Sequence, residues 1–165
     1  MTTKQNKTEM TRRRFIGASA VATFGFQVVP SRVFGANSRL AVAGIGSGGK
    51  GRADITGAAK AGADIVALCD VDESRADAMF KTHAKAKRFA DFRVMLEKMG
   101  KSIDACTIST PDHTHAAATS MAMKMGKHCY TQKPLTHDVY EARDLTRLAR
   151  ETGVTTQMGN QAHAG

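Results

Sequence analysis

The chain has 165 residues, enough for one domain and hardly for two, and its 42% hydrophobic and 24% charged residues indicate a globular protein. The net charge is +9, but residues 1–36 contribute +5 of it, from six basic residues and one acid. Nucleic-acid-binding surfaces usually combine clustered basic residues with stacking aromatics, whereas this chain has two tyrosines and no tryptophan. The composition therefore disfavours a nucleic-acid partner.

The first 36 residues read as an export signal. "TRRRFIG" (residues 11–17) joins basic residues to an apolar stretch, and no charge follows between Arg14 and Arg32. The Thr-Arg-Arg-x-Phe-Ile order resembles a twin-arginine signal. The apolar run is too interrupted for a membrane span, which needs roughly 20 apolar residues. We expect a signal segment over 1–36, read by the twin-arginine export machinery, and a periplasmic or otherwise exported domain over 37–165. A basic amphipathic helix or a disordered tail is the alternative for the first segment.

Strand-like and helix-like segments alternate through the rest of the chain. Apolar runs bounded by turn residues predict strands near 39–43, 63–70, 102–110, 127–131 and 154–159. Helical periodicity with start and stop signals predicts helices near 49–61, 73–85, 91–100, 113–125 and 138–152. This alternation predicts one α/β domain of Rossmann type, with a doubly wound parallel sheet and helices on both faces.

The cysteines and histidines do not form a metal-site pattern. Cys69, Cys106 and Cys129 are odd in number, lack C-x-x-C spacing, and fall in or beside strand-like runs. We expect them to be small buried apolar residues. His113 and His115 begin a helix without a third ligand at suitable spacing, which favours capping or ribose contact over a metal.

The stretch "GIGSGGKG" holds five glycines in eight positions. It matches the phosphate-binding pattern G-x-G-x-x-G through Gly44, Gly46 and Gly49. It also matches the start of a nucleoside-triphosphatase loop, until Gly51 replaces the hydroxyl that must hold magnesium after Lys50. The triphosphatase interpretation loses its metal anchor, which leaves a dinucleotide loop or a merely flexible turn.

The position of this loop favours the dinucleotide. It follows the first predicted strand and opens the first helix, whose N-terminal amides and dipole attract a phosphate. We expect Gly44 to permit the tight turn, Gly46 to let the backbone approach a pyrophosphate, and Gly49 to let helix and strand pack closely. Ser47 and Gly48 complete the predicted cofactor loop.

An acid stands where such a loop needs one. Asp70 ends the second predicted strand, 21 positions after Gly49, close to the expected spacing of about 20. Its carboxylate can accept hydrogen bonds from a ribose diol and would repel a 2′-phosphate, which favours NAD over NADP. Arg52 or Arg75 would soften that preference. A methyl-donor (S-adenosylmethionine) site, which also uses a glycine loop and an acid, is a rival interpretation.

Three later stretches follow the same order as in one enzyme family. "STPDHTH" (109–115), "GKHCYTQKPLT" (126–136) and "TQMGNQ" (156–161), together with the glycine loop and "CDVDESR", resemble the glucose–fructose oxidoreductase/inositol dehydrogenase (Gfo/Idh/MocA) family. The resemblance runs over about residues 38–161. It implies an NAD-binding Rossmann domain.

The resemblance also implies roles for individual residues. Thr110, Pro111 and His115 would lie beside the nicotinamide ribose, and Asn160 would make a minor cofactor contact, although it could equally form a turn. Lys133 belongs to the family's Glu-Lys-Pro motif, where it helps to place the substrate hydroxyl and tunes proton transfer. The residues alone leave open whether Lys133 has this catalytic role or is a solvated loop cation.

Two departures from the family pattern stand out. Gln132 replaces the family's glutamate, which keeps the shape and a hydrogen-bond acceptor for the cofactor but loses the charge. Family members also continue into a second domain that supplies the substrate pocket, and this chain stops where that domain should start. We therefore expect a truncated form that is inactive alone and self-associates through exposed apolar surface.

The sequence thus predicts the NAD-binding domain of an exported oxidoreductase that acts on a sugar or polyol by hydride transfer. Two alternatives remain open. One is a nucleotide-binding module without catalysis. The other is the cofactor half of a glycosidase that uses NAD transiently.

Overall fold

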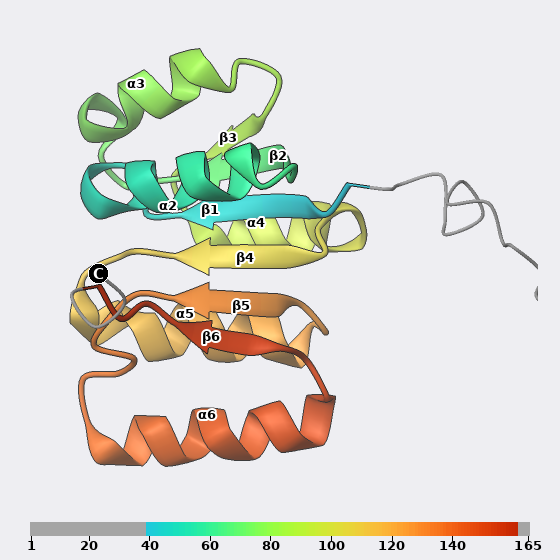
Figure 1. Ribbon diagram of the computed structural model, residues 1–165, viewed down its shortest axis with the longest axis vertical. Coiled ribbons are helices and arrows are strands. Elements are labelled where there is room, and N and C mark those ends of the chain that lie inside the picture. Colours follow the sequence, from blue (N-terminus) through green and yellow to red (C-terminus); the bar gives the residue numbers. More distant parts are fainter. Residues whose placement is uncertain (1–38, 162–165) are drawn as a thin grey trace, which may run out of the picture. The chain divides into compact units, whose positions relative to one another are not determined.

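Parallel strands form one six-stranded sheet in the computed structural model, which describes residues 39–161 (Figure 1). The strand order is β3-β2-β1-β4-β5-β6. The strands are β1 (Ala41–Ile45), β2 (Asp64–Cys69), β3 (Lys87–Phe89), β4 (Ala105–Ile108), β5 (His128–Thr131) and β6 (Thr156–Met158). This arrangement confirms the predicted Rossmann-type α/β fold. The predicted signal segment lies outside the described residues.

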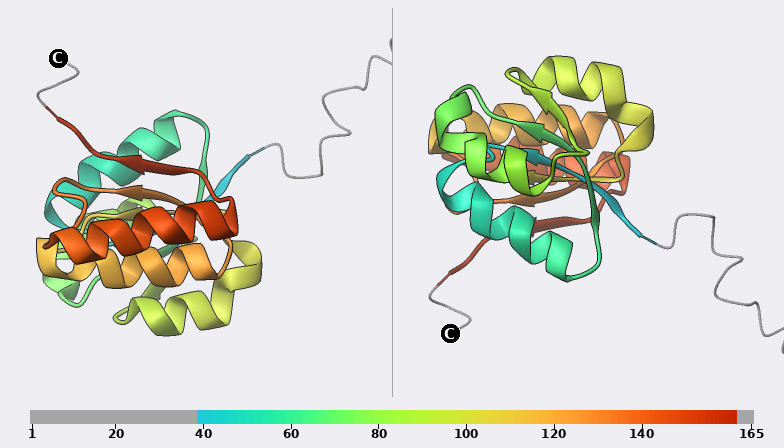
Figure 2. Two further views of the ribbon diagram at one scale, coloured as in Figure 1. Left: turned by 90° about the horizontal axis from the view of Figure 1, so that it is seen from below. Right: turned by 90° about the horizontal axis from the view of Figure 1, so that it is seen from above.

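Helices cover both faces of the sheet (Figure 2). They are α2 (Gly49–Lys60), α3 (Glu73–Thr82), α4 (Phe92–Met99), α5 (Asp112–Lys124) and α6 (Val139–Thr152), with a short 3-10 helix η2 at Gly100–Ser102. Helices α2 and α3 contribute to one hydrophobic cluster and α4, α5 and α6 to the other. None of the helices within residues 39–161 is both long and apolar enough to cross a membrane.

Alternating side chains of β1 explain why both faces need a cover. Val42 joins the α2–α3 cluster, whereas Ala43 and Ile45 join the cluster under α4 to α6. A strand that is apolar on both sides is stable only when helices shield both faces. Leu96 of α4 is a fully buried residue of the cluster under α4 to α6, and its truncation to alanine would lower the free energy of unfolding by about 2–5 kcal/mol.

Local signals in the sequence set several helix ends. The predicted cap Asp91 accepts a hydrogen bond from the Arg93 amide at 2.9 Å, and α4 begins directly after it. Gly153 ends α6 in the left-handed conformation, with φ of 68°. These ends direct the chain back to the sheet for the next parallel strand.

Two elements differ from the prediction. Strand β3 was missed because its three residues lie at the sheet edge and are not buried, so they show no apolar run. The strand predicted over 102–110 is shorter: η2 occupies its start and β4 covers Ala105–Ile108. Because β3 was not predicted, the residues that follow it were not recognised as candidates for the site described below.

Candidate functional site

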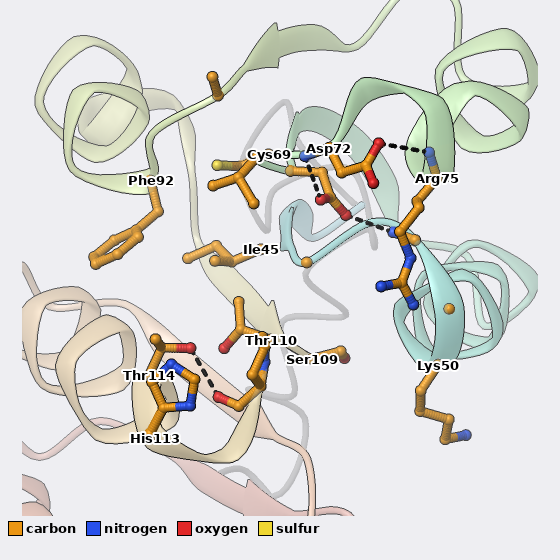
Figure 3. Close-up of a pocket in the computed structure, with 17 residues that line it drawn as sticks. Ile45, Lys50, Cys69, Asp72, Arg75, Phe92, Ser109, Thr110, His113 and Thr114 are labelled. Carbon is orange, nitrogen blue, oxygen red and sulfur yellow. Dashed lines mark hydrogen bonds between the residues drawn. The ribbon is translucent and has the colours of Figure 1, made fainter.

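A cavity of about 520 Å³ opens at the edge of the sheet where the parallel strands end (Figure 3). Segments that follow β1, β2, β3 and β4 line it. In the strand order, β1 lies between β2 and β4. The chain therefore continues from β1 to one side of the sheet, to β2 and β3, and then resumes on the other side of β1 with β4. Such a switch point is where open α/β sheets bind their ligands.

The glycine loop at this edge uses a different register from the predicted one. Gly44 lies inside β1, where an added Cβ would come within 2.5 Å of the Ile55 side chain. Its absence of a side chain allows α2 to pack against β1, so the predicted turn role of Gly44 is wrong. The turn is at Gly46, which has φ of +82° and whose added Cβ would lie 2.7 Å from the Ser109 backbone.

Gly51 provides the close approach that the prediction gave to Gly49. A Cβ on Gly51 would lie 1.7 Å from the Gly46 carbonyl oxygen, so only glycine fits there. Gly49 instead faces the cavity, with φ of +49° and only the Arg75 guanidinium within 4 Å of an added Cβ. The G-x-G-x-x-G spacing is therefore met structurally by Gly46, Gly48 and Gly51.

Hydrogen bonds to β2 hold this loop in place. The backbone N–H groups of Gly46 and Ser47 both donate to the Cys69 carbonyl, at 2.8 and 3.2 Å. The Ser47 hydroxyl is buried and donates to the same oxygen at 3.2 Å. Ser47 thus fixes the loop from behind and does not line the cavity, unlike Gly46, Gly48 and Gly49.

The start of α2 is suited to an anion. Its N-cap residue, Gly48, has no side chain to cap the amides of the first turn, and that turn contains no acid. The unpaired N–H groups of a first helical turn and the positive end of the helix dipole both attract phosphate. Lys50 and Arg75 add positive charge on the same wall of the cavity (Figure 3).

The Asp70 carboxylate is hydrogen-bonded to the glycine loop, next to the start of α2. Its Oδ2 accepts from the Gly48 N–H at 2.8 Å, and its Oδ1 accepts from the Asp72 N–H at 3.0 Å. A carboxylate offers about four acceptor positions, so ribose hydroxyls can still bond to it. On the facing wall, the Thr110 Oγ1 is shielded and has no hydrogen-bond partner within residues 39–161. The amides at the start of α2 and the Asp70 carboxylate fit the phosphates and hydroxyls of a dinucleotide.

The remaining wall is apolar and includes residues that the sequence did not single out as site residues. Val71, Ala90 and Phe92 line it, and Val71 is 89% exposed. Ala90 and Phe92 follow β3, and they become recognisable only once that strand is known. Cys69 also borders the cavity, where burial, with a smaller contribution from the Asp70 charge, raises the pKa of its thiol to about 12. The thiol is protonated at neutral pH and is not a nucleophile.

The later predicted residues divide into three groups. Thr110 and Pro111 line the cavity. His115 is buried behind it, with its ring nitrogens 2.8 Å from the Thr110 carbonyl and 2.7 Å from the Pro134 carbonyl, so it ties the two loops together. Lys133 and Asn160 are exposed and lie outside the cavity lining. The structure thus does not place the proposed catalytic lysine against the cavity.

Gln132 belongs to a buried network that includes an unpredicted acid, Asp54. Its Nε2 donates to Asp54 Oδ2 at 2.9 Å, and the Ser109 hydroxyl donates to the same oxygen at 2.8 Å. The backbone N–H of Lys133 donates to Gln132 Oε1 at 3.0 Å. Lys50 pairs with the other Asp54 oxygen at 3.1 Å. The spacing of Lys50 and Asp54 by four residues on a helix was the available signal for this acid.

The described residues do not bring together a set of side chains that could bind a metal ion. Within residues 39–161, no group of three His, Cys, Asp or Glu side chains could hold an ion. The three cysteines there are free and buried. The prediction that these cysteines are small buried residues is therefore confirmed.

Comparison with known proteins agrees with this geometry. Residues 38–160 match the Gfo/Idh/MocA family, described as an oxidoreductase family with an NAD-binding Rossmann fold. A curated relative, scyllo-inositol 2-dehydrogenase (NAD(+)) of Bacillus subtilis, is 33% identical over 121 residues, which are 73% of this chain and 35% of the relative. Inositol 2-dehydrogenase of Paracoccus denitrificans is 28% identical over 116 residues, covering 70% of this chain and 34% of that protein.

Solved structures give the same result. UDP-N-acetylglucosamine 3-dehydrogenase GnnA of Acidithiobacillus ferrooxidans superposes with a TM-score of 0.64 and 29% identity, covering 73% of this chain and 38% of that one. The WlbA dehydrogenase of Bordetella pertussis, solved with NADH and UDP-GlcNAcA, has a TM-score of 0.69 at 20% identity, covering 76% and 39%. That second likeness shows the fold alone. The chain spans roughly a third of the length of these proteins, and with residues 38–160 matched it belongs to the Gfo/Idh/MocA oxidoreductase family as an NAD-binding Rossmann domain.

Proposed function

We propose that this chain is the cofactor-binding part of an exported dehydrogenase that transfers a hydride between NAD and a sugar or polyol. One observation carries the proposal: the start of α2, which has no side-chain cap from its N-cap residue, and the carboxylate of Asp70 border the same cavity. The first group suits a diphosphate and the second a ribose diol. Glycine at positions 46 and 51 is required by the backbone packing that brings them together.

The cofactor preference follows from charge. The Asp70 carboxylate lines the place where a ribose would bind and would repel a 2′-phosphate, which favours NAD over NADP. Arg75 lines the same cavity and lowers this repulsion without removing the carboxylate. Bound NAD would supply the hydride acceptor, and the protein supplies binding and orientation.

Lys133 is the proposed catalytic residue. Its side chain is exposed and free to meet a substrate, while its backbone N–H is fixed by the Gln132 side chain. An ammonium group held at a strand end can hold a substrate hydroxyl and exchange a proton with it. Because Lys133 lies outside the cavity, we propose that further chain completes the substrate site and that this chain alone binds NAD without turning substrate over.

The relatives support a polyhydroxylated substrate. Their names include a D-glucoside 3-dehydrogenase of Escherichia coli, a D-apiose dehydrogenase of Paraburkholderia graminis and the two inositol dehydrogenases. These names describe dehydrogenases of a sugar, a sugar glycoside and inositols, all of which carry several hydroxyl groups. We propose the same class of substrate here, without choosing among its members.

NAD binding is the direct test. Calorimetric titration of NAD into the purified chain should give saturable binding, and Asp70→Ala should weaken it at least about tenfold, because charged hydrogen bonds to the ribose are lost. Asp77→Ala, which removes an exposed acid on α3, is the matched control and should leave the affinity unchanged. No binding at about millimolar NAD, the weak end of specific affinities, contradicts the proposal.

Export by the twin-arginine pathway is a separate proposal. Its support is the order of residues 11–16, "TRRRFI", ahead of an uncharged stretch. A fusion of residues 1–36 to a folded reporter should reach the periplasm. The double change Arg12→Lys and Arg13→Lys should retain it in the cytoplasm, whereas Lys4→Arg, which keeps the charge outside the motif, should not.

A further inference from the structure

The network around Asp54 lies beside the cavity: its members Lys50 and Ser109 line the cavity, whereas Asp54 and Gln132 are not part of the lining. The Asp54 side chain is only 6% exposed, and Gln132 is 4% exposed. The orientation of the Gln132 amide is fixed by its neighbours, because a backbone N–H can only donate and a carboxylate can only accept. Oε1 therefore faces Lys133 N, and Nε2 faces Asp54.

The network connects three segments of the site through one carboxylate oxygen. Asp54 is on α2, Ser109 follows β4, and Gln132 follows β5. Oδ2 of Asp54 accepts from both Ser109 and Gln132. Gln132 then passes the constraint on to the backbone of Lys133. The position of the Lys133 backbone thus depends on an acid 79 residues earlier in the chain.

Charge is the second property of this network. A buried carboxylate is stable only when several donors satisfy it. Asp54 has the Ser109 hydroxyl, the Gln132 amide and the ammonium of Lys50, whose side chain is 45% exposed and therefore a partly screened partner. Of these two side chains, Asp54 and Gln132, only Asp54, on α2, is an acid, so the negative charge of the pair lies on α2 and not at position 132.

We propose that Asp54 is a positioning residue for Lys133, acting through Gln132, and that it brings a negative charge to the part of the site that Ser109 and Gln132 border. The inference rests on the proposed function for its catalytic meaning. Its structural part, the dependence of Gln132 on Asp54, stands on the hydrogen bonds alone.

Substitutions can separate the two parts. Asp54→Asn can present a carbonyl oxygen where Oδ2 lies and keep the bonds from Ser109 and Gln132, so it removes mainly the charge and the Lys50 ion pair. Gln132→Glu places two buried carboxylates within hydrogen-bond distance, and these cannot both ionise cheaply. The double variant Asp54→Asn/Gln132→Glu restores one donor facing one carboxylate, with the charge moved to position 132.

The first experiment measures urea unfolding and needs no ligand. The free energy of unfolding of Gln132→Glu should fall below that of the wild type as the pH rises from about 5.5 to 8, because the native pair retains a proton that the unfolded chain releases. The double variant should lose this pH dependence and recover most of the stability. If the two single effects simply add in the double variant, the coupling is absent and the proposal is wrong.

The second experiment compares the dissociation constants of NAD⁺ and NADH for the same proteins. Oxidised nicotinamide is cationic and reduced nicotinamide is neutral. Asp54→Asn should therefore weaken the binding of NAD⁺ severalfold more than the binding of NADH. The double variant, which carries the negative charge at position 132, should restore the preference for NAD⁺. Asp77→Asn, which removes a surface acid, should leave the ratio unchanged. An unchanged ratio in Asp54→Asn overturns the charge role. If the wild type binds neither nucleotide, the proposed function fails, while the unfolding experiment still decides the coupling.

Discussion

The Oδ2 atom of Asp70 accepts a hydrogen bond from the backbone N–H of Gly48, with 2.8 Å between the two atoms. This bond connects the end of β2 to the residue that caps α2. The acid expected to bind ribose therefore also shapes the loop expected to bind phosphate. The two halves of the site are coupled before any ligand arrives.

This coupling gives the first prediction. Asp70→Ala should lower the free energy of unfolding by about 1–3 kcal/mol, since it leaves the amides of Gly48 and Asp72 without their acceptor. Asp70→Asn should lie between, because an amide oxygen can replace only one of the two acceptors. Urea unfolding of both variants would test the order. Equal stability of Asp70→Ala and wild type would show that the loop holds its shape without Asp70.

The glycines of α2 give a second prediction with a control in the same helix. Gly51→Ala should be strongly destabilising, because its Cβ would lie 1.7 Å from the Gly46 carbonyl oxygen and backbone must move. Gly57→Ala meets nothing within 4 Å and should stabilise the protein by up to about 1 kcal/mol through helix propensity. Thermal unfolding should place the two variants on opposite sides of the wild type. A neutral Gly51→Ala would contradict the observed helix start.

The fold was readable because most of its elements carry strong local signals. Buried strands such as "ADIVALCD" show continuous apolar runs, and α6 has a clear amphipathic period ended by Gly153. Strand β3 has neither signal, since its pairing with β2 is made by backbone atoms at an exposed edge. The sequence therefore predicted the sheet type but missed one strand and the site residues that follow it.

The sequence indicated the location of the glycine loop, but not which of its glycines make the turn and the close backbone contact. The glycine stretch contains two overlapping frames of the same motif, and only the end of β1 at Ile45 decides between them. Asp54 was missed for a different reason. Its partners Ser109 and Gln132 lie 55 and 78 residues away, so its role follows from tertiary contacts that no local pattern shows.

His115 gives a third prediction. Its buried ring has a nitrogen close to each of two loop carbonyls, so His115→Phe fills the volume but removes the ring nitrogens that connect the two loops. The cost should be about 1–3 kcal/mol, because partly buried loop carbonyls lose their contact with the ring. His113→Phe, at an exposed position on the same helix, should cost little. Urea unfolding tests both variants, and equal costs would show that the loops do not depend on His115.

The cysteines give a prediction about alkaline pH. Burial raises the pKa of Cys69 and of Cys129 to about 12 and also raises that of Cys106, from an ordinary value of 9.0. Above the ordinary value the unfolded chain releases thiol protons that the native chain keeps. The native state then binds more protons, and the free energy of unfolding must fall as the pH rises.

Two measurements check this result. Iodoacetamide at about pH 8 should leave the native thiols unmodified and label them in urea, because alkylation needs an accessible thiolate. Urea unfolding near pH 10 should show a loss of stability relative to pH 8, and Cys69→Ala should reduce that slope, since each thiol contributes up to about 1.4 kcal/mol per pH unit. Rapid labelling of Cys69 in the native chain would mean that the wall of the cavity opens to solvent. It would also contradict the conclusion that this thiol is not a nucleophile.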